Sequence, residues 1–113
     1  MSIYDAQTID FFAVDHRSNV VFLVIADHLP WDEHEGEHLM TVQEKINAYL
    51  AFMESGEIFE KIPVSVGLSI VIKWMGKYPL SEQALKFYDF AETLIEGAGF
   101  ELEFEEADFS LQN

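Results

Sequence analysis

The sequence predicts an α+β fold in which a four-stranded mixed sheet carries two helices on one face, in the chain order ββαβαβ. Three observations predict this fold. Two runs near the start are rich in β-branched and aromatic residues and are separated by turn-forming residues. Two later segments repeat apolar residues at helical spacing, and each is followed or preceded by a strand-like run. Crossovers through a helix are right-handed, so both helices reach the same face of the sheet.

The first two strands form a predicted β-hairpin over residues 8–14 and 20–26. Side chains alternate along a strand, and apolar residues occupy both the odd and the even positions of these two runs. The hairpin is therefore apolar on both faces, whichever register its strands adopt. Since the helices cover one face, we expect another surface to cover the second.

The first helix is predicted to begin near Glu33, where Asp32 or a neighbour can act as the N-cap and acidic residues suit the positive end of the helix dipole. Apolar residues then recur along one stripe at helical spacing. They are Leu39, Val42, Ile46, Tyr49, Leu50 and Met53. Ser55 and Gly56 are predicted to end the helix.

The third strand is predicted over residues 67–75 and is closed by a Gly-Lys-Tyr-Pro turn. Ser81 then caps the second helix, and Leu80 and Leu85 are placed to pack across this cap as a hydrophobic staple. One stripe of this helix is expected to be buried. It consists of Ala84, Phe87, Tyr88, Ala91, Leu94, Ile95 and Ala98. A glycine shortly after the stripe ends the helix.

The last strand is predicted from strict alternation of apolar and acidic residues, which indicates one buried and one wet face. The alternating residues are Phe100, Leu102 and Phe104 with Glu101, Glu103 and Glu105. Residues 108–113 are expected to form a frayed tail. A chain of 113 residues is expected to be a single domain, spanning residues 1–113.

The composition excludes several partners. Asp and Glu number 21 against 6 Lys and Arg, which gives a net charge of −15. Nucleic acid and anionic membranes both need clustered cations, and here the cations are scattered. A basic protein partner, a cation or solubility alone remains as a reason for the charge. The chain has no cysteine, no basic and apolar leader and no apolar run long enough to cross a bilayer, so we expect a cytoplasmic protein.

Residues 34–38 read His-Glu-Gly-Glu-His and match the His-Glu-x-x-His pattern of zinc metallopeptidases. In that pattern two histidines one helical turn apart bind zinc, and the glutamate takes a proton from the metal-bound water. Here the intervening Glu37 is charged and Gly36 weakens the helix, so the zinc hydrolase is a remote option. Divalent metal binding and an ordinary solvated helix start are the alternatives. The candidate metal ligands are His28, Asp32, His34 and His38.

Other catalytic patterns are missing from the sequence. It has no glycine-rich phosphate loop, no Gly-x-Ser-x-Gly turn and no cysteine nucleophile. Carboxylates are so numerous that any acid/base pair picked from them is uninformative. We therefore assign no catalytic residue and expect no cofactor apart from the divalent metal considered above.

Several short segments share a pattern with a known family. They are residues 27–29, 31–32, 37–39, 43–50, 54–56, 78–79 and 99–100. The pattern resembles a family of small bacterial proteins known only as a domain of unknown function, and the likeness runs from the hairpin to the last strand. This resemblance implies a compact cytoplasmic domain and no particular activity. It directs attention to five candidate ligand-binding residues, which are His28, Trp31, His38, Lys45 and Tyr49.

The two-sided hairpin predicts an interface, because leaving three or four of its apolar side chains wet forfeits about 1.5 to 3 kcal/mol each. We expect a second copy of the chain to cover it. The alternative is cover from the loop at 27–37 or the connection at 57–66. Helical spacing also places Phe90 on the polar side of its helix. The candidate interface residues are Phe11, Phe12, Phe22, Leu23 and Phe90.

Two classes of function follow from the sequence. The first is a non-enzymatic interaction protein, acting as a homodimer or as an immunity-like partner of a basic protein. Its marks are the net charge, the two-sided hairpin and the lack of a catalytic set. The second is a protein that binds a metal or a small molecule with the loop at residues 27–38. We favour the first class.

Overall fold

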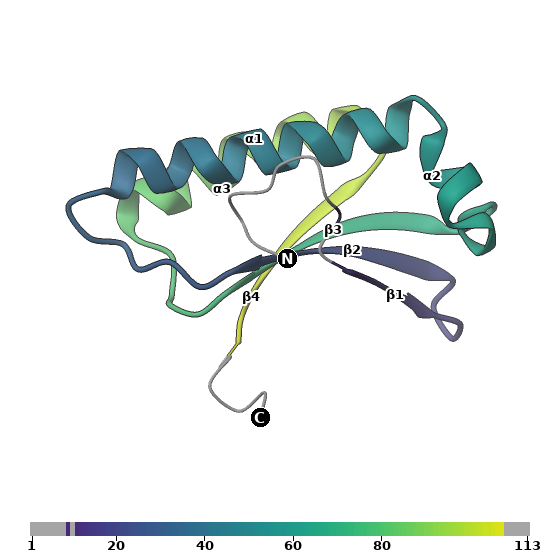
Figure 1. The fold of residues 1–113 in the computed structure, drawn as a ribbon, viewed down its shortest axis with the longest axis horizontal. Coiled ribbons are helices and arrows are strands. Elements are labelled where there is room, and N and C mark those ends of the chain that lie inside the picture. Colours follow the sequence, from purple (N-terminus) through teal and green to yellow (C-terminus); the bar gives the residue numbers. More distant parts are fainter. Residues whose placement is uncertain (1–8, 10, 108–113) are drawn as a thin grey trace.

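The computed structural model describes residue 9 and residues 11–107 (Figure 1). Residue 8, at which the first strand was predicted to begin, and the predicted tail at 108–113 lie outside the described residues. The elements follow in this order: β1 (Phe11–Asp15), β2 (Val20–Asp27), α1 (Glu35–Glu54), α2 (Glu57–Lys61), the 3-10 turn η1 (Pro63–Ser65), β3 (Ser69–Gly76), α3 (Glu82–Gly97) and β4 (Glu101–Glu106).

The predicted α+β class with a four-stranded mixed sheet is confirmed, with strand order β1-β2-β3-β4. β1 pairs antiparallel with β2, whereas β2 with β3 and β3 with β4 are parallel. α1 and α3 lie over the same face of the sheet (Figure 1). This arrangement follows from two crossovers of the same hand.

The predicted element order is incomplete, because the connection at 57–66 contains α2 and η1. With 5 residues, α2 is too short to produce a recognisable helical period in the sequence. Gly56, with φ of 84°, ends α1 as predicted and turns the chain into α2. This left-handed conformation strains any residue with a Cβ, which is why a glycine suits the position.

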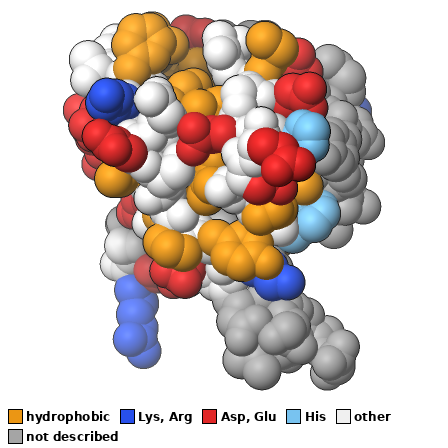
Figure 2. All heavy atoms as spheres, turned by 90° about the vertical axis from the view of Figure 1, so that its left-hand side faces the viewer, with side chains coloured by type: hydrophobic (Ala, Val, Ile, Leu, Met, Phe, Trp, Pro, Cys, Tyr) orange, Lys and Arg blue, Asp and Glu red, His pale blue; other side chains and the backbone are white. Residues whose placement is uncertain are grey.

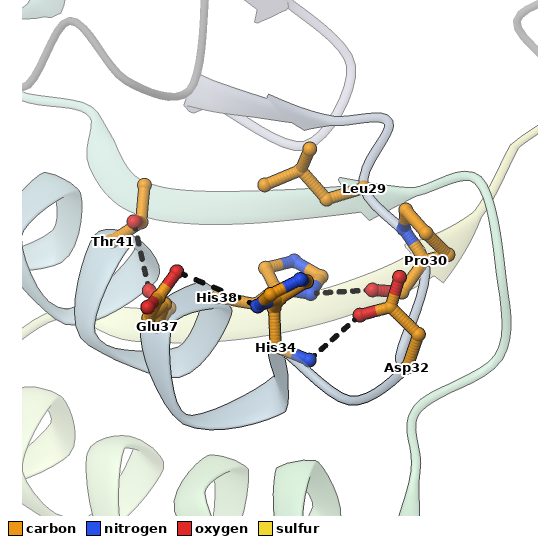
Figure 3. A pocket seen from close by; sticks show the side chains of 7 residues that line it. All are labelled: Leu29, Pro30, Asp32, His34, Glu37, His38 and Thr41. Carbon is orange, nitrogen blue, oxygen red and sulfur yellow. Dashed lines mark hydrogen bonds and ion pairs between the residues drawn. The ribbon is translucent and has the colours of Figure 1, made fainter.

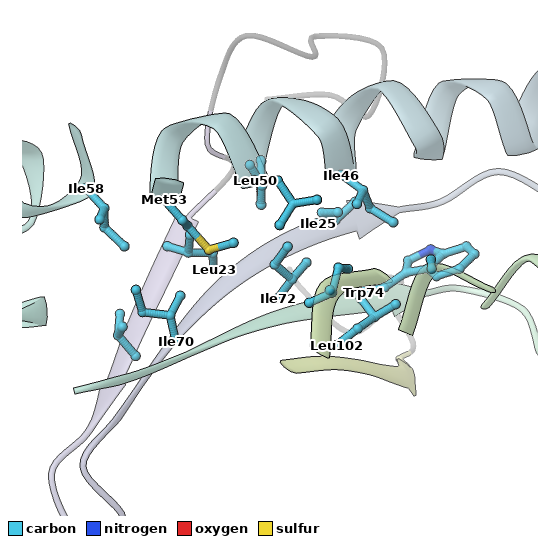
Figure 4. Packing of buried hydrophobic residues seen from close by; sticks show 14 of the residues in the cluster. Leu23, Ile25, Ile46, Leu50, Met53, Ile58, Ile70, Ile72, Trp74 and Leu102 are labelled. Atoms are coloured by element: carbon cyan, nitrogen blue, oxygen red, sulfur yellow. The ribbon is translucent and has the colours of Figure 1, made fainter. Parts of the chain in front are cut away.

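The core lies between the sheet and the two long helices (Figure 4). Strand parity directs alternate residues of β2 and β3 toward α1 and α3. Those residues are Val21, Leu23, Ile25, Ile70, Ile72 and Trp74. Trp74 is fully buried, and the rings of Phe87 and Phe104 meet it edge-on at 6.1 and 5.4 Å between centroids.

Leu23 is the one interface candidate that the fold removes, since it is fully buried in this core. The register pairs it with Phe12, so both side chains point to the helix-facing side of the sheet. On the far face the register pairs Phe11 with Val24, and Phe22 extends beneath the Lys73 ammonium at 4.6 Å from its ring. The hairpin is therefore apolar on both faces, as the sequence indicated.

The helix boundaries differ from expectation at the start of α1, which begins at Glu35 and not near Glu33. Asp32 does not cap the helix. Its Oδ1 accepts the backbone N–H of His34 at 2.9 Å, which forms a turn just before the helix. Ser81 caps α3 as predicted, because its Oγ accepts the backbone N–H of Ala84 at 3.1 Å.

The buried stripe of α3 is narrower than predicted. Leu94 and Ala98 were expected in the core, yet both are exposed. Tyr88 reaches β4 and Phe87 meets Trp74 on β3, and helical rotation places Leu94 beyond Phe87, outside the centre of the stripe that meets the sheet. In β4 the prediction is confirmed, because Leu102 is buried and the glutamates beside it are exposed.

Candidate functional site

The candidate site is built around Asp27, the last residue of β2. Strand parity gives Asp27 the same inward direction as Ile25, and the side chain is buried. Its Oδ1 accepts the backbone N–H of Leu29 at 3.1 Å. Its Oδ2 accepts the indole N–H of Trp74 at 2.9 Å and lies 2.6 Å from Nε2 of His38. Both side-chain oxygens thus have hydrogen-bond partners, as a buried polar group requires.

His38 completes this network from the first turns of α1. Its Nδ1 lies 3.2 Å from the carbonyl oxygen of Pro30, which can only accept, so this nitrogen carries a hydrogen. The Trp31 ring stacks on the imidazole at 3.6 Å between centroids, with an interplanar angle of 17°. The imidazole is therefore fixed by two hydrogen bonds and one stacked ring. The network joins the ends of β2 and β3 to the loop and to α1.

A cavity of about 290 Å³ adjoins this network at the start of α1 (Figure 3). Its lining residues are Leu29, Pro30, Asp32, His34, Glu37, His38 and Thr41. His34 is exposed, and its Nδ1 lies 3.9 Å from Oε2 of Glu37. The cavity thus has an acidic, solvated mouth and a floor that includes the buried His38.

The structure separates the five predicted ligand-binding residues into three places. Trp31 and His38 stack beside the cavity. Lys45 and Tyr49 are fully buried in the core, where Nζ of Lys45 lies 5.7 Å from the Tyr49 ring centroid and the Tyr49 hydroxyl donates to the carbonyl of Val24 at 2.6 Å. His28 is exposed and does not line the cavity. Of the five residues, Trp31 and His38 are the pair that the fold places at the cavity.

The two histidines of the His-Glu-x-x-His match have different surroundings. His34 is exposed, whereas both ring nitrogens of His38 already face Asp27 and Pro30. Across residue 9 and residues 11–107, no three His, Asp or Glu side chains are grouped so that they would hold a metal ion. The predicted ligands His28, Asp32, His34 and His38 are thus not gathered, and the geometry lends the zinc hydrolase no support.

Sequence reasoning missed Asp27 and Trp74, the two partners that fix His38. A signal for Asp27 was present in the sequence. Counting by twos from Val21 through the strand places Asp27 on the inward face, where an acidic residue needs hydrogen-bond donors. Trp74 had no such signal, because its indole N–H reaches Asp27 only once β2 and β3 pair in register.

Comparison with known protein families gives one match. Residues 1–108 match the model of a family of unknown function, DUF6572. The chain belongs to this family. Membership confirms the predicted resemblance to a domain of unknown function, and the DUF6572 description assigns no activity. The comparisons with curated proteins and with solved structures gave no significant match. Within the described part of this DUF6572 member, no helix has the length and apolar character needed to cross a bilayer.

Proposed function

We propose that the protein is a non-enzymatic interaction module that forms a homodimer by pairing its β1 edge with the β1 edge of a second copy. The observation that carries this proposal is the contrast between the two edges of the sheet. β1 is an apolar edge with a single acidic residue, Asp15, whereas β4 is an edge with four glutamates.

The geometry of β1 supports strand pairing. Alternate residues of an edge strand direct their N–H and C=O groups away from the neighbouring strand, and among the described residues β1 pairs with β2 alone. Phe11 and Phe12 are 45% and 47% exposed on its two faces. A groove of about 440 Å³ runs beside them toward α1 and α2. Its lining residues, which define the β1 groove, are Ile9, Phe11, Phe12, Phe52, Lys61 and Ile62.

Antiparallel pairing of two β1 strands would join two four-stranded sheets into one continuous sheet. Each exposed phenylalanine would then meet apolar side chains of the second copy, which removes the two aromatic faces from water. The β1 grooves of the two copies would lie on the same side of the joined sheet. This geometry is closed by a two-fold axis, so assembly stops at the dimer.

Charge selects β1 over β4 as the pairing edge. Glu101, Glu103, Glu105 and Glu106 are all exposed, so two β4 strands would place like charges side by side. The net charge of −15 opposes any association of two copies. Exposed charges more than about 8 Å apart are largely screened at physiological salt. Arg17 in the β1–β2 turn and Lys61 of α2, which lines the β1 groove, also add cations near this edge. The proposed dimer should therefore weaken at low salt.

The test is the change Ala13→Glu, which puts a carboxylate in the middle of β1 at an exposed position. Its matched control is Ala51→Glu, the same change at an exposed position of α1. Wild type and control should scatter light as a particle of twice 13.0 kDa, and Ala13→Glu should raise the dissociation constant at least about tenfold. Circular dichroism checks that both variants fold. A 13.0 kDa wild type at micromolar concentration, or equal weakening in both variants, rejects the proposal.

The cavity at the start of α1 favours a second candidate function, the binding of a small cationic molecule. Asp32 and Glu37 line its mouth, and the fixed His38 forms part of its floor. Amide resonances of Leu29 and Thr41 would report on binding in titrations with zinc chloride and, separately, with spermidine. Saturable shifts that disappear in Thr41→Trp, which fills the cavity, would support this function. Flat titrations in both series would remove it.

A further inference from the structure

The β1 groove is an apolar hollow with one charged side chain on its wall. Its volume of about 440 Å³ lies within the range of about 300 to 1,000 Å³ that small-molecule sites occupy. Five of its six described lining residues are apolar, and three of these are phenylalanines. Lys61 is the sixth. The groove thus offers aromatic faces and a single ammonium group side by side.

The walls of the β1 groove come from elements that are distant in the chain. Phe11 and Phe12 belong to β1, and Phe52 lies in the last turn of α1. Gly56, in its left-handed conformation, turns the chain into α2, whose last residue is Lys61. Figure 1 shows α2 and the hairpin at the same end of the molecule. The fold therefore places the ammonium group beside the phenylalanines of the hairpin edge.

Lys61 has no ion-pair partner among the residues that the structure describes. The ion pairs found there join other side chains. Glu57 lies one helical turn before Lys61, but it does not line the groove. Lys61 is exposed, so a ligand can reach its ammonium group. A carboxylate that lay in the groove would form a charge-assisted hydrogen bond with it.

We propose that the β1 groove binds a small carboxylate with an apolar body. The body would lie on the phenylalanine rings, and the carboxylate would meet Lys61. The lining side chains select this class, because none carries a hydroxyl or an amide. A phosphate has more acceptor oxygens than one ammonium group can satisfy. The six lining residues belong to one copy of the chain, so this inference does not rest on the proposed dimer.

The charge of the whole chain opposes the binding of an anion. A net charge of −15 attracts cations and repels anions at long range. Figure 2 shows Asp and Glu side chains beside histidines at the end of the molecule where α1 begins, which is the end opposite α2. A preference for an anion over a cation of the same length therefore requires a nearby cation such as Lys61. This requirement sets the direction of the test.

The probes are sodium octanoate and octylamine, which share the same carbon chain and differ in the sign of their charge. Amide resonances of Phe52 and Ile62 report on the groove. In wild type they should shift saturably, and octanoate should bind about fivefold more tightly than octylamine. Lys61→Met keeps an apolar stem without the charge, so it should abolish this preference. Lys86→Met, at an exposed position of α3, is the matched control and should retain it.

The apolar wall of the groove is tested by the length of the ligand. Each methylene that becomes buried strengthens binding by up to about fourfold, so affinity should rise from hexanoate through heptanoate to octanoate. Circular dichroism of both lysine variants checks that they fold. An affinity that does not change with length would mean that Lys61 alone attracts the anion, and the proposed site would be rejected.

Three further outcomes would overturn the proposal. The first is the absence of a saturable shift up to about 10 mM octanoate, and the second is equal affinity of wild type for octanoate and octylamine. The third is a set of octanoate shifts at Leu29 and Thr41, which line the acidic cavity, without shifts at Phe52 and Ile62. Light scattering on the same samples separates this site from the dimer. Octanoate binding by a 13.0 kDa particle rejects the dimer alone, and a dimer without octanoate binding rejects this site alone.

Discussion

In the described part of the chain, β1 and β4 are the two edges of one sheet and leave the same kind of backbone groups unpaired, but their side chains differ in charge and in apolar character. β4 carries glutamate at four of its 6 positions, and these charges repel a second strand. β1 carries two phenylalanines, Ala13 and Val14, with Asp15 at its end. The comparison teaches that side chains, and not backbone geometry, distinguish the two edges of this sheet, and the proposed dimer depends on that difference.

The two edges also differ in what holds them. The Tyr88 hydroxyl of α3 bonds to the β4 backbone, and Phe104 packs against Trp74 beneath the helix. β1 is held mainly through its pairing with β2 and through the turn that joins them. In that turn Ser18 and the backbone N–H of Arg17 hydrogen-bond the Asp15 carboxylate and lower the pKa of that group. On the helix-facing side of the sheet β1 is thus the less covered edge, since Phe12 is exposed whereas Leu102 is buried.

The largest expected effect comes from breaking the support that both edges share, the β2–β3 pair. His38→Ala leaves the buried Asp27 carboxylate without its closest partner, at 2.6 Å, and removes the ring on which Trp31 stacks. Removing one member of a buried pair costs about 3 to 5 kcal/mol. Urea unfolding followed by tryptophan fluorescence should show this loss.

The matched control for that experiment is His34→Ala, four residues earlier and exposed. Surface changes of this kind alter the free energy of unfolding by about 0.5 kcal/mol or less. Equal stabilities of the two alanine variants would mean that the Asp27–His38 pair does not support the sheet.

An intermediate effect is expected from removing the glutamate charges that keep another strand from pairing with β4. Glu101→Thr with Glu103→Thr leaves a β-branched, uncharged edge and spares Glu105, which pairs with Lys73 at 3.2 Å. β1 of one copy can then pair with β4 of another copy. This head-to-tail contact leaves a free edge at each end, so further copies can add. We expect assemblies larger than the wild-type particle in sedimentation velocity, from a gain of about 1 kcal/mol per contact.

The control for the β4 change is Glu44→Thr with Glu54→Thr, which removes the same charge from exposed positions of α1. This variant should sediment as wild type does. Large assemblies in both double variants would show that net charge, and not the β4 edge, limits association.

Much of this fold was predictable because it rests on local patterns. The apolar stripe of α1, the Ser81 cap and the alternation in β4 each involve neighbours within a few residues, and the structure confirms them. The narrower buried stripe of α3 was not predictable in the same way. Whether Leu94 is covered depends on how closely α1 packs beside that flank of α3, which no residue near Leu94 encodes.

The candidate site shows the same limit more sharply. Trp31 and His38 were singled out from the sequence, but their meaning changes with Asp27 and Trp74. These two are 47 positions apart in the chain, and strand register alone brings the indole N–H to the carboxylate. Once that register is known, His38 is explained by its contacts with Asp27 and Trp31 in the fold. Its place in a His-Glu-x-x-His pattern then no longer implies zinc chemistry.

The smallest expected effect concerns the tie between α3 and the β4 edge, and it depends on pH. Partial burial and the nearby Glu92 raise the pKa of Tyr88 from 10.0 to about 12. In the unfolded chain this tyrosine ionises near pH 10, so between pH 10 and pH 12 the folded protein keeps the hydroxyl proton that the unfolded chain has lost. The stabilisation from neutral Tyr88 is complete below pH 10 and is lost as the pH rises toward 12. Tyr88→Phe should therefore flatten the alkaline fall of the unfolding free energy.

The Phe variant should also lose about 0.5 to 1.5 kcal/mol of unfolding free energy at neutral pH, because it lacks the hydroxyl that donates to the carbonyl of Leu102. Tyr78→Phe is the control, since it removes one tyrosine hydroxyl from an exposed position. Urea titrations at closely spaced alkaline pH values measure the slope for all three proteins. If the unfolding free energies of Tyr88→Phe and wild type fall in parallel with rising pH, the pKa of the Tyr88 hydroxyl is not raised by folding. The β4 edge would then depend on Phe104 packing, and its firmer hold relative to β1 would come from apolar contact alone.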